Sequence, residues 1–246
     1  MSRARFSVLS LNMHKGLSPL NRRVTVHDLR ERLHRLSPDI VFLQEVQDAH
    51  ERHAARLSDW PSLAQSRFLA HDIWPEVHYG RNAVYDHGHH GNLILSRFPV
   101  HAVRNDDISE HRFERRGLLH ATITLDGVQV HCFCVHLGLF ERGRRRQIET
   151  IVDAVIERAG ADGPVIVAGD FNDWRNFAED RLARVGLADV FRVERTRLPR
   201  TFPGRLPLLR LDRIYARGLA IVQAQRLTSW ARVSDHLALM ATFEMP

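Results

Sequence analysis

A carboxylate and a carboxamide stand two residues apart in this chain, directly after an apolar run. The run covers residues 164–168 and is typical of a short buried strand, and Asp170 and Asn172 follow it. Because side chains alternate along a strand, we expect both to project from one side of the sheet rim. There, a carboxylate can accept a proton or bind a metal ion, and a carboxamide can hold a phosphate oxygen. The alternative is an Asx-rich turn after a strand.

Polar or titratable side chains stand at the ends of other predicted strands as well. Glu45 ends an apolar strand over residues 39–46, which is costly unless the glutamate is exposed, paired or bound to a cation. The other members of this set are Asn12 at the end of residues 6–12, His136 at the end of residues 128–136, Asp212 within residues 210–215, and Asp235 with His236 just before residues 237–243.

The order of the elements predicts an α/β fold. Between the first two strands, Thr25 and Asp28 have the form of a capping box, and leucines follow at helical spacing until Pro38. Strand, helix and strand in this order are typical of a βαβ-like start. Residues 117–125 and 128–136 are expected to form a hairpin around the turn Asp126-Gly127.

A helix is predicted over residues 143–159, from an apolar stripe at helical spacing. Four arginines, Arg142 and Arg144–Arg146, gather at its start, where cations oppose the helix dipole. This indicates that some of them serve an anion, although exposed arginines of this kind are often plain surface charges.

Residues 68–84 show no clear period, and a glycine- and histidine-rich loop is predicted over residues 86–92. Its three histidines could bind zinc, but no cysteine or carboxylate stands at a matching spacing. A loop at the mouth of a site is the favoured interpretation.

Length and composition favour one globular domain over residues 1–246. The formal net charge of +6, almost all of it from arginine, favours polyanions such as nucleic acid or an anionic membrane surface. Cys132 and Cys134 lie on one strand face and suit neither a disulfide framework nor a zinc knuckle. We expect no signal peptide, no transmembrane segment and no obligate protein partner, and hence a protein of the cytoplasm or the inner membrane surface.

Taken together, the segments Leu-Asn-Met-His-Lys-Gly, Leu-Gln-Glu-Val, Val-His-Leu-Gly, Gly-Asp-Phe-Asn-Asp-Trp, Leu-Asp-Arg-Ile-Tyr and Ser-Asp-His resemble the motifs of the endonuclease/exonuclease/phosphatase superfamily in order and spacing. The resemblance covers nearly the whole chain. It implies the DNase I-like fold, a four-layer α/β sandwich of two packed mixed sheets flanked by helices. It also implies a hydrolase of phosphoric esters that depends on Mg²⁺, with Mn²⁺ as a substitute.

The same resemblance implies roles for individual residues. Glu45 would be the principal metal ligand, with Asn12 and Asp235 as ligands or phosphate contacts, in keeping with the preference of Mg²⁺ for oxygen ligands. The implied catalytic group is Asp170 to activate water, Asn172 to hold a phosphate oxygen, His236 paired with Asp212, and His136 facing the phosphate.

The substrate within this superfamily is open: a nucleic acid, or a lipid or small-molecule phosphodiester, with a phosphomonoester as a further alternative. Candidate substrate contacts are Asn12, Lys15, His89, Asn92, Arg144, Arg205 and Arg210, several of which could equally be surface charges. A non-catalytic binding module on the same fold is the alternative from another class. Such a module should lack one of the residues Glu45, Asp170, Asp235 and His236, and all four are present.

Overall fold

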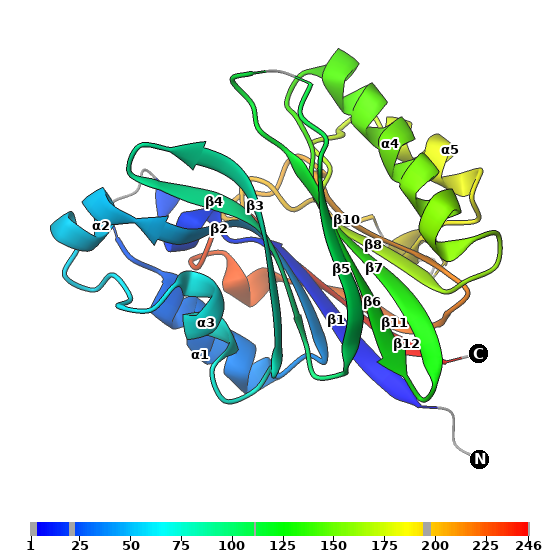
Figure 1. The fold of residues 1–246 in the computed structure, drawn as a ribbon, viewed down its shortest axis with the longest axis horizontal. Coiled ribbons are helices and arrows are strands. Elements are labelled where there is room, and N and C mark those ends of the chain that lie inside the picture. Colours follow the sequence, from blue (N-terminus) through cyan, green and yellow to red (C-terminus); the bar gives the residue numbers. More distant parts are fainter. Residues whose placement is uncertain (1–3, 20–22, 111, 194–197, 246) are drawn as a thin grey trace.

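Two six-stranded β-sheets pack face to face, and helices cover their outer sides (Figure 1). The computed structural model describes residues 4–19, 23–110, 112–193 and 198–245. Residues 1–3, at the start of the stretch in which no signal peptide is expected, lie outside the described residues.

The first sheet contains β1 (Arg5–Asn12), β2 (Ile40–His50), β3 (Glu76–Tyr85), β4 (Gly88–Ser96), β11 (Ala220–Leu227) and β12 (Ala238–Glu244). Its strand order is β11-β12-β1-β2-β4-β3. The β1 and β2 strands are parallel and the other neighbours antiparallel, so the sheet is mixed. The parallel pair is the βαβ-like start that the sequence predicts.

The second sheet contains β5 (Val100–Asp107), β6 (Gly117–Leu125), β7 (Val128–His136), β8 (Val165–Asp170), β9 (Ala188–Asp189) and β10 (Asp212–Arg217). Its strand order is β5-β6-β7-β8-β10-β9, with β7 and β8 as its parallel pair. The predicted hairpin of β6 and β7 is confirmed, with Leu125 opposite Val128 at its turn.

Helices lie on the outer faces of both sheets (Figure 1). The helices are α1 (Val26–Leu36), α2 (Glu51–Arg56), α3 (Gln65–Ala70), α4 (Glu141–Ala159), α5 (Phe177–Ala183) and α6 (Val190–Val193), with short 3₁₀ turns η1 (His14–Gly16) and η3 (Thr228–Trp230). One apolar cluster joins the first sheet to α1 and α3, and another joins the second sheet to α4 and α5. A third cluster lies between the sheets. These clusters confirm the four-layer α/β sandwich.

Strand β1 shows how the alternation of side chains builds these layers. Phe6 and Val8 point into the cluster between the sheets, whereas Leu9 and Leu11 pack under the helices of the first sheet. Both faces of the strand are therefore buried over most of its length, and its apolar residues Phe6, Val8, Leu9 and Leu11 are divided between them.

The predicted capping box at the start of α1 is wrong. Thr25 is the N-cap residue, but its backbone is already near-helical, with φ −117° and ψ −3°, and its side chain makes no capping hydrogen bond. A capping side chain needs an extended N-cap backbone to reach the first free N–H groups. The predicted apolar face is correct, since Leu29 and Leu33 are buried.

The predicted loop over residues 86–92 is also wrong, because β4 begins at Gly88 and pairs with β3 along its length. Strand β5 was not predicted either. The glycines that indicate a loop serve close strand approach instead: a Cβ on Gly91 would lie 1.8 Å from the carbonyl oxygen of Gly80. The glycines and histidines of residues 88–91 therefore belong to a strand, although their residue types predict a loop.

Glu45 does not end its strand, because β2 continues to His50. The pairing of β2 with β4 shifts register between Leu43 and Val46, and Glu45 has a φ of +57°. This is a β-bulge, which changes the direction of one side chain without ending the strand. It turns the Glu45 side chain toward the sheet edge where the other strand ends meet.

No helix in the described part of the chain combines the length and apolar character needed to cross a membrane.

The cluster between the sheets should dominate the stability of the fold. Phe42 is fully buried there, so Phe42→Ala should lower the free energy of unfolding by about 3–5 kcal/mol. Phe113 is mostly exposed, and Phe113→Ala should change the free energy of unfolding by about 0.5 kcal/mol or less. Urea unfolding followed by circular dichroism measures both. Equal effects of the two substitutions would contradict the assignment of Phe42 to the core.

Candidate active site

Strand ends from both sheets meet at one edge of the sandwich, and Asp170 lies where they meet. Within the second sheet, Asp170 is the register partner of His136 on β7 and of Asp212 on β10. From the first sheet, the Asn12 amide donates a hydrogen bond of 3.0 Å to Asp170 Oδ2. The two sheets are thus joined at this point by a buried hydrogen bond.

Asp170 is almost completely buried, and its oxygens have several partners. Oδ1 accepts from the backbone N–H of Asn172 at 2.9 Å. Oδ2 lies 3.6 Å from His136 Nε2 and 3.8 Å from His236 Nε2. Burial raises the pKa of Asp170 to about 6, against the opposing effect of the His236 charge and of the hydrogen bonds from Asn12 and Asn172. The carboxyl is therefore mostly ionised at neutral pH, with a pKa much nearer to neutrality than that of an ordinary aspartate.

Asn172 lies beside this carboxylate, but not through strand alternation. Its φ of +48° takes it out of the strand, and its N–H bond to Asp170 closes an Asx turn. Its side-chain amide donates to the carbonyl oxygen of Leu137 at 2.9 Å. The sequence predicts either an Asx turn or a polar site after this strand. In the structure the same two residues, Asp170 and Asn172, form both.

His236 is held as a cation. Its Nδ1 lies 2.8 Å from Asp212 Oδ2, and its ring packs 4.9 Å from the ring of Phe202. Burial alone lowers the pKa of His236, but the charges of Asp212 and Asp170 and the hydrogen bond to Asp212 outweigh it and raise the pKa to about 10. The Asp212 bond fixes Nδ1–H, which leaves Nε2–H directed toward Asp170.

His136, on the other side of Asp170, is held neutral. Burial lowers its pKa well below the ordinary value, and the positive charges of Arg116 and His236 lower it further. The two histidines beside Asp170 therefore differ in protonation at neutral pH: one is a fixed cation and the other can accept or donate a proton.

Glu45 places an ionised carboxylate at the outer side of the cluster. Its Oε1 lies 3.4 Å from the Asn12 amide nitrogen, and its Oε2 lies 4.0 Å from Lys15 Nζ. Burial raises the pKa of Glu45, but the charges of Lys15 and His14 and the Asn12 bond hold it below its ordinary value. An ionised carboxylate beside an ammonium group and a hydrogen-bond donor fits a site for a hard cation such as Mg²⁺.

Asp235 belongs to the same edge, because His14 and Ser234, which lie beside it, both bond to Asn12. Its Oδ2 is 3.2 Å from His14 Nδ1, and Ser234 beside it donates to the carbonyl oxygen of Asn12 at 2.6 Å. Asp170, Asp212 and His236 also place one ligand atom each within 4.8 Å of one another. A metal ion there would have to displace the proton of a histidine that two carboxylates hold cationic. The oxygen set of Glu45, Asn12 and Asp235 is therefore the better fit.

Several predicted substrate contacts are not brought to this cluster. Arg210 pairs with the buried Asp189 on β9. Arg144 is buried, donates to the carbonyl oxygens of Gly138 and Leu139, and lies 4.7 Å over the Trp174 ring. Near the start of α4, the Arg144 guanidinium thus binds backbone carbonyl oxygens and packs on an aromatic ring.

His89 also points away from the cluster, with Nδ1 2.9 Å from the Tyr79 hydroxyl. Arg205 is exposed on a turn whose neighbour Gly204 donates to the Asp235 carbonyl oxygen at 2.5 Å. Arg205 is therefore beside the site, whereas His89 is not part of it.

Asn92 is buried beneath the cluster and joins the sheets a second time. From β4 it donates to the carbonyl oxygens of Gly117 at 2.9 Å and Cys134 at 3.1 Å, both in the second sheet. It lines a small cleft together with Glu45 and His136. Its role in the structure is to position that cleft.

Besides the backbone of Gly91, the cleft is lined by four side chains that are not among the predicted site residues: Asn82, His90, Arg115 and Arg116. Strand alternation would have found His90, since it stands two residues before Asn92 on the same strand face. Burial lowers the pKa of His90 to about 4, so its ring is neutral. Arg116 donates to the Leu137 carbonyl at 3.2 Å and pairs with Glu114 at 3.0 Å.

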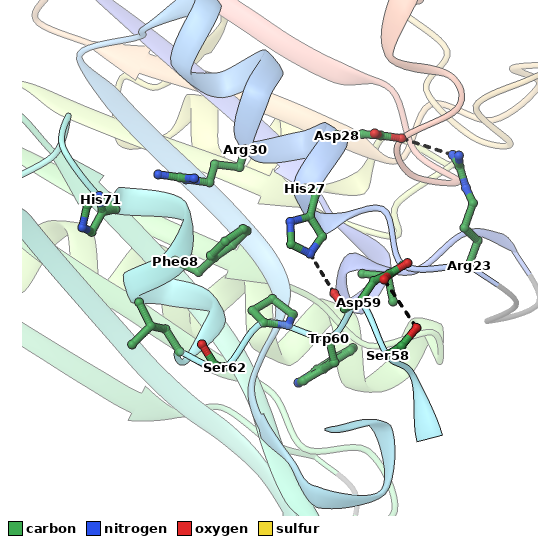
Figure 2. Close-up of a pocket in the computed structure, with 13 residues that line it drawn as sticks. Arg23, His27, Asp28, Arg30, Ser58, Asp59, Trp60, Ser62, Phe68 and His71 are labelled. Carbon is green, nitrogen blue, oxygen red and sulfur yellow. Dashed lines mark hydrogen bonds and ion pairs between the residues drawn. The ribbon is translucent and has the colours of Figure 1, made fainter. Parts of the chain in front are cut away.

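A larger cavity, of about 850 Å³, lies elsewhere and shares no residue with the cluster. It is bounded by the start of α1, residues 58–63 and the end of α3, as Figure 2 shows. There His27 Nε2 lies 2.7 Å from the Asp59 carbonyl oxygen, and Arg30 lies 5.0 Å over the Phe68 ring. Size alone does not mark the chemical site: the histidines and aspartates that line this cavity, His27, His71, Asp28 and Asp59, form no cluster like that of Asp170, Asp212 and His236 in the described residues.

The chain is similar to known proteins over most of its length. It is 43% identical to Escherichia coli K12 protein YbhP over 245 residues, which cover 98% of this chain and 96% of that protein. An endonuclease/exonuclease/phosphatase of Beutenbergia cavernae has a similar fold, with a TM-score of 0.78 at 20% identity, covering 99% of this chain and 72% of that one. D. rerio TDP2, solved with a single-strand DNA product, has a TM-score of 0.70 at 20% identity, covering 98% of this chain and 100% of that one.

The match to a family model settles the classification, since it includes each of the six strand-end motifs. The model described as the Endonuclease/Exonuclease/phosphatase family matches residues 9–236. The chain belongs to the endonuclease/exonuclease/phosphatase family.

Proposed function

We propose that the chain is a divalent-metal-dependent phosphodiesterase and that residues 1–246 form one catalytic unit. Members of the family are generally metal-dependent phosphoesterases. One observation carries the proposal for this chain: a buried carboxylate, Asp170, stands between a neutral and a cationic histidine, beside the anionic Glu45. A binding module without catalysis would have no need to maintain these opposed protonation states.

Asp170 is the group we assign to the attacking water. A general base works best when its pKa is near the working pH, and the pKa of Asp170 is raised to about 6. The carboxylate can take a proton from water as the oxygen attacks phosphorus. Its fixed hydrogen bonds from Asn12 and Asn172 orient it for this task.

Positive charge and hydrogen-bond donors around Asp170 oppose the charge that develops on phosphate oxygens. His236 is already cationic and rigidly held by Asp212, so it needs no rearrangement as the transition state forms. Lys15 lies on the Glu45 side of the cluster. His136 is neutral and can transfer a proton to or from the reacting groups.

Glu45, with Asn12 and Asp235, would hold the metal ion, Mg²⁺ or in its place Mn²⁺. When bound, the ion would supply positive charge to a phosphoryl oxygen. The Lys15 ammonium near Glu45 and the His14 ring near Asp235 balance these carboxylates in the present structure.

A diester is favoured over a monoester by the space beside the cleft. A groove of about 620 Å³ continues from His90, Arg115 and Arg116, which line both spaces. A second substituent on the phosphorus would have room there. Phosphomonoester hydrolysis is the competing outcome of the experiment that follows.

The test is release of p-nitrophenol from bis-p-nitrophenyl phosphate and p-nitrophenyl phosphate, with Mg²⁺ or Mn²⁺ and with chelator. We expect metal-dependent release, faster from the diester. Glu45→Gln should abolish it, because it removes the anionic ligand and keeps the shape. Glu141→Gln, at a half-buried glutamate of α4 paired with Arg145 and Arg175, is the matched control and should leave the rate unchanged. Metal-independent release, or none from either ester, would contradict the proposal.

Loss of the cationic His236 side chain should lower the catalytic rate strongly. His236→Ala should lower kcat by roughly 10²–10⁴-fold, the range for acid–base groups, or about 3–5 kcal/mol of barrier. Steady-state kinetics with the diester measure it, with circular dichroism to establish that the variant is folded. A folded variant with the rate of the parent protein would remove His236 from the mechanism.

The pH profile should report both buried groups. In the parent protein the rate should fall below about pH 6 as Asp170 gains a proton, and stay level until the pH nears about 10, where His236 loses its charge. Asp212→Asn removes a negative charge that raises both pKa values, so both limbs should move to lower pH. Measurement of kcat/KM from acid to alkaline pH tests this, and an unmoved alkaline limb in the variant would contradict the role of Asp212.

A further inference from the structure

Large apolar side chains gather on the connections around the catalytic cleft. Val84 near the tip of the β3–β4 hairpin is 67% exposed, and Phe113 in the β5–β6 connection is 80% exposed. Leu139 and Phe140, between β7 and α4, are 57% and 64% exposed. Single exposed apolar residues are ordinary on a protein surface, but a group that rims one site marks an interaction surface.

These residues belong to one surface. Val84, Phe113, Leu139 and Phe140 all line the groove of about 620 Å³ that shares His90, Arg115 and Arg116 with the cleft. Figure 1 shows the β5–β6 connection rising beside the start of α4. We call Val84, Phe113, Leu139 and Phe140, together with Arg112, the apolar rim.

Exposed leucines stand on a second connection beside the site. Leu206, Leu208 and Leu209 are exposed on the segment between Thr201 and Asp212, whose Gly204 donates to the Asp235 carbonyl oxygen. The cleft therefore has exposed apolar side chains on the Glu45 and His90 side and on the Asp235 side.

Positive charge accompanies the apolar rim. The Arg112 guanidinium lies 4.5 Å over the Phe113 ring, and Arg115 is exposed and only loosely paired, at 3.5 Å from Asp107. The whole chain carries a formal net charge of +6. Apolar side chains that enter the lipid headgroup layer, with arginines among them, match an anionic membrane surface in both polarity and charge.

We propose that the catalytic edge docks on an anionic phospholipid membrane through the apolar rim, and that the substrate is a phosphodiester of a lipid headgroup. This rests on the proposed phosphodiesterase function. Docking would place the cleft at the height of the headgroup phosphates, and the groove beside it would take the apolar part of the lipid.

The composition of the apolar rim favours a lipid over single-stranded nucleic acid. Bases stack on aromatic faces and on arginine planes. Here the Arg112 plane already lies over Phe113, and Val84 and Leu139 are aliphatic and offer no face for stacking. Nucleic-acid binding through the same residues is instead an outcome that the experiment can detect.

The experiment is co-sedimentation of the full chain with vesicles of phosphatidylcholine, with and without one third phosphatidylglycerol. We expect binding to the anionic vesicles that weakens with salt and is much weaker on phosphatidylcholine alone. The double variant Val84→Ser/Phe113→Ser should lower the partition coefficient by at least about tenfold, since two exposed apolar side chains are lost. Arg112→Gln should weaken binding to the anionic vesicles only.

The matched control is Ile156→Ser, at a residue of α4 that is 55% exposed and not part of the apolar rim. It should bind vesicles like the parent protein. Ile156→Ser should hydrolyse soluble bis-p-nitrophenyl phosphate at the parent rate. Val84, Phe113 and Arg112 line the groove beside the cleft, so their variants need only keep metal-dependent hydrolysis of this ester, which distinguishes a failure of docking from a failure of the proposed function.

Three outcomes would overturn the proposal. The first is absence of binding by the parent protein to anionic vesicles, and the second is equal binding by the double variant. The third is retention of a single-stranded oligonucleotide, or self-association in analytical ultracentrifugation, that the double variant loses while vesicle binding is unaffected.

Discussion

The site depends on the burial of one carboxylate, Asp170, where the two sheets meet. An isolated buried charge is very costly, so the surrounding residues must supply donors and positive charge. Asn12 supplies a donor from the first sheet, the Asn172 backbone supplies another from the following turn, and His236 supplies the charge. The same burial that makes these partners necessary raises the pKa of Asp170 to about 6 and brings it into the range useful for a general base.

Neighbouring histidines in one small volume show how position decides protonation. His236 has two carboxylates within 4 Å and is cationic. His136 has only Asp170, at 3.6 Å, and burial together with the positive charges of Arg116 and His236 lowers its pKa and keeps it neutral. Neither state follows from residue type. Both protonation states follow from which strand ends the fold brings together. One sheet edge can therefore offer a cation (His236), a proton carrier (His136) and a carboxylate base (Asp170) at the same time.

Much of the fold and the centre of the site could be predicted from sequence, because apolar runs followed by polar residues are a local signal. This signal indicates Asn12, His136 and Asp170, whereas His236 stands just before an apolar run, that of residues 237–243. The bulge at Glu45 could not be predicted, since it arises from pairing with a distant strand. The histidine- and glycine-rich strand β4 was taken for a loop, so His89 was chosen where His90 faces the cleft. Arg210 and Arg144 have distant partners, Asp189 and Trp174, that no local pattern indicates.

The hydrogen bond from Asn12 to Asp170 spans 158 residues of sequence, and those from Asn92 to Gly117 and Cys134 cross between the same two sheets. Contacts so distant along the chain can form only after both sheets exist, and such contacts slow folding. Neither sheet alone holds the whole centre: the second sheet brings Asp170 beside His136 and Asp212, whereas Asn12 and Glu45 belong to the first. Enzymatic competence would thus be among the last properties to emerge on refolding, and a nascent chain would carry no exposed hydrolytic centre before its final strand has joined the first sheet.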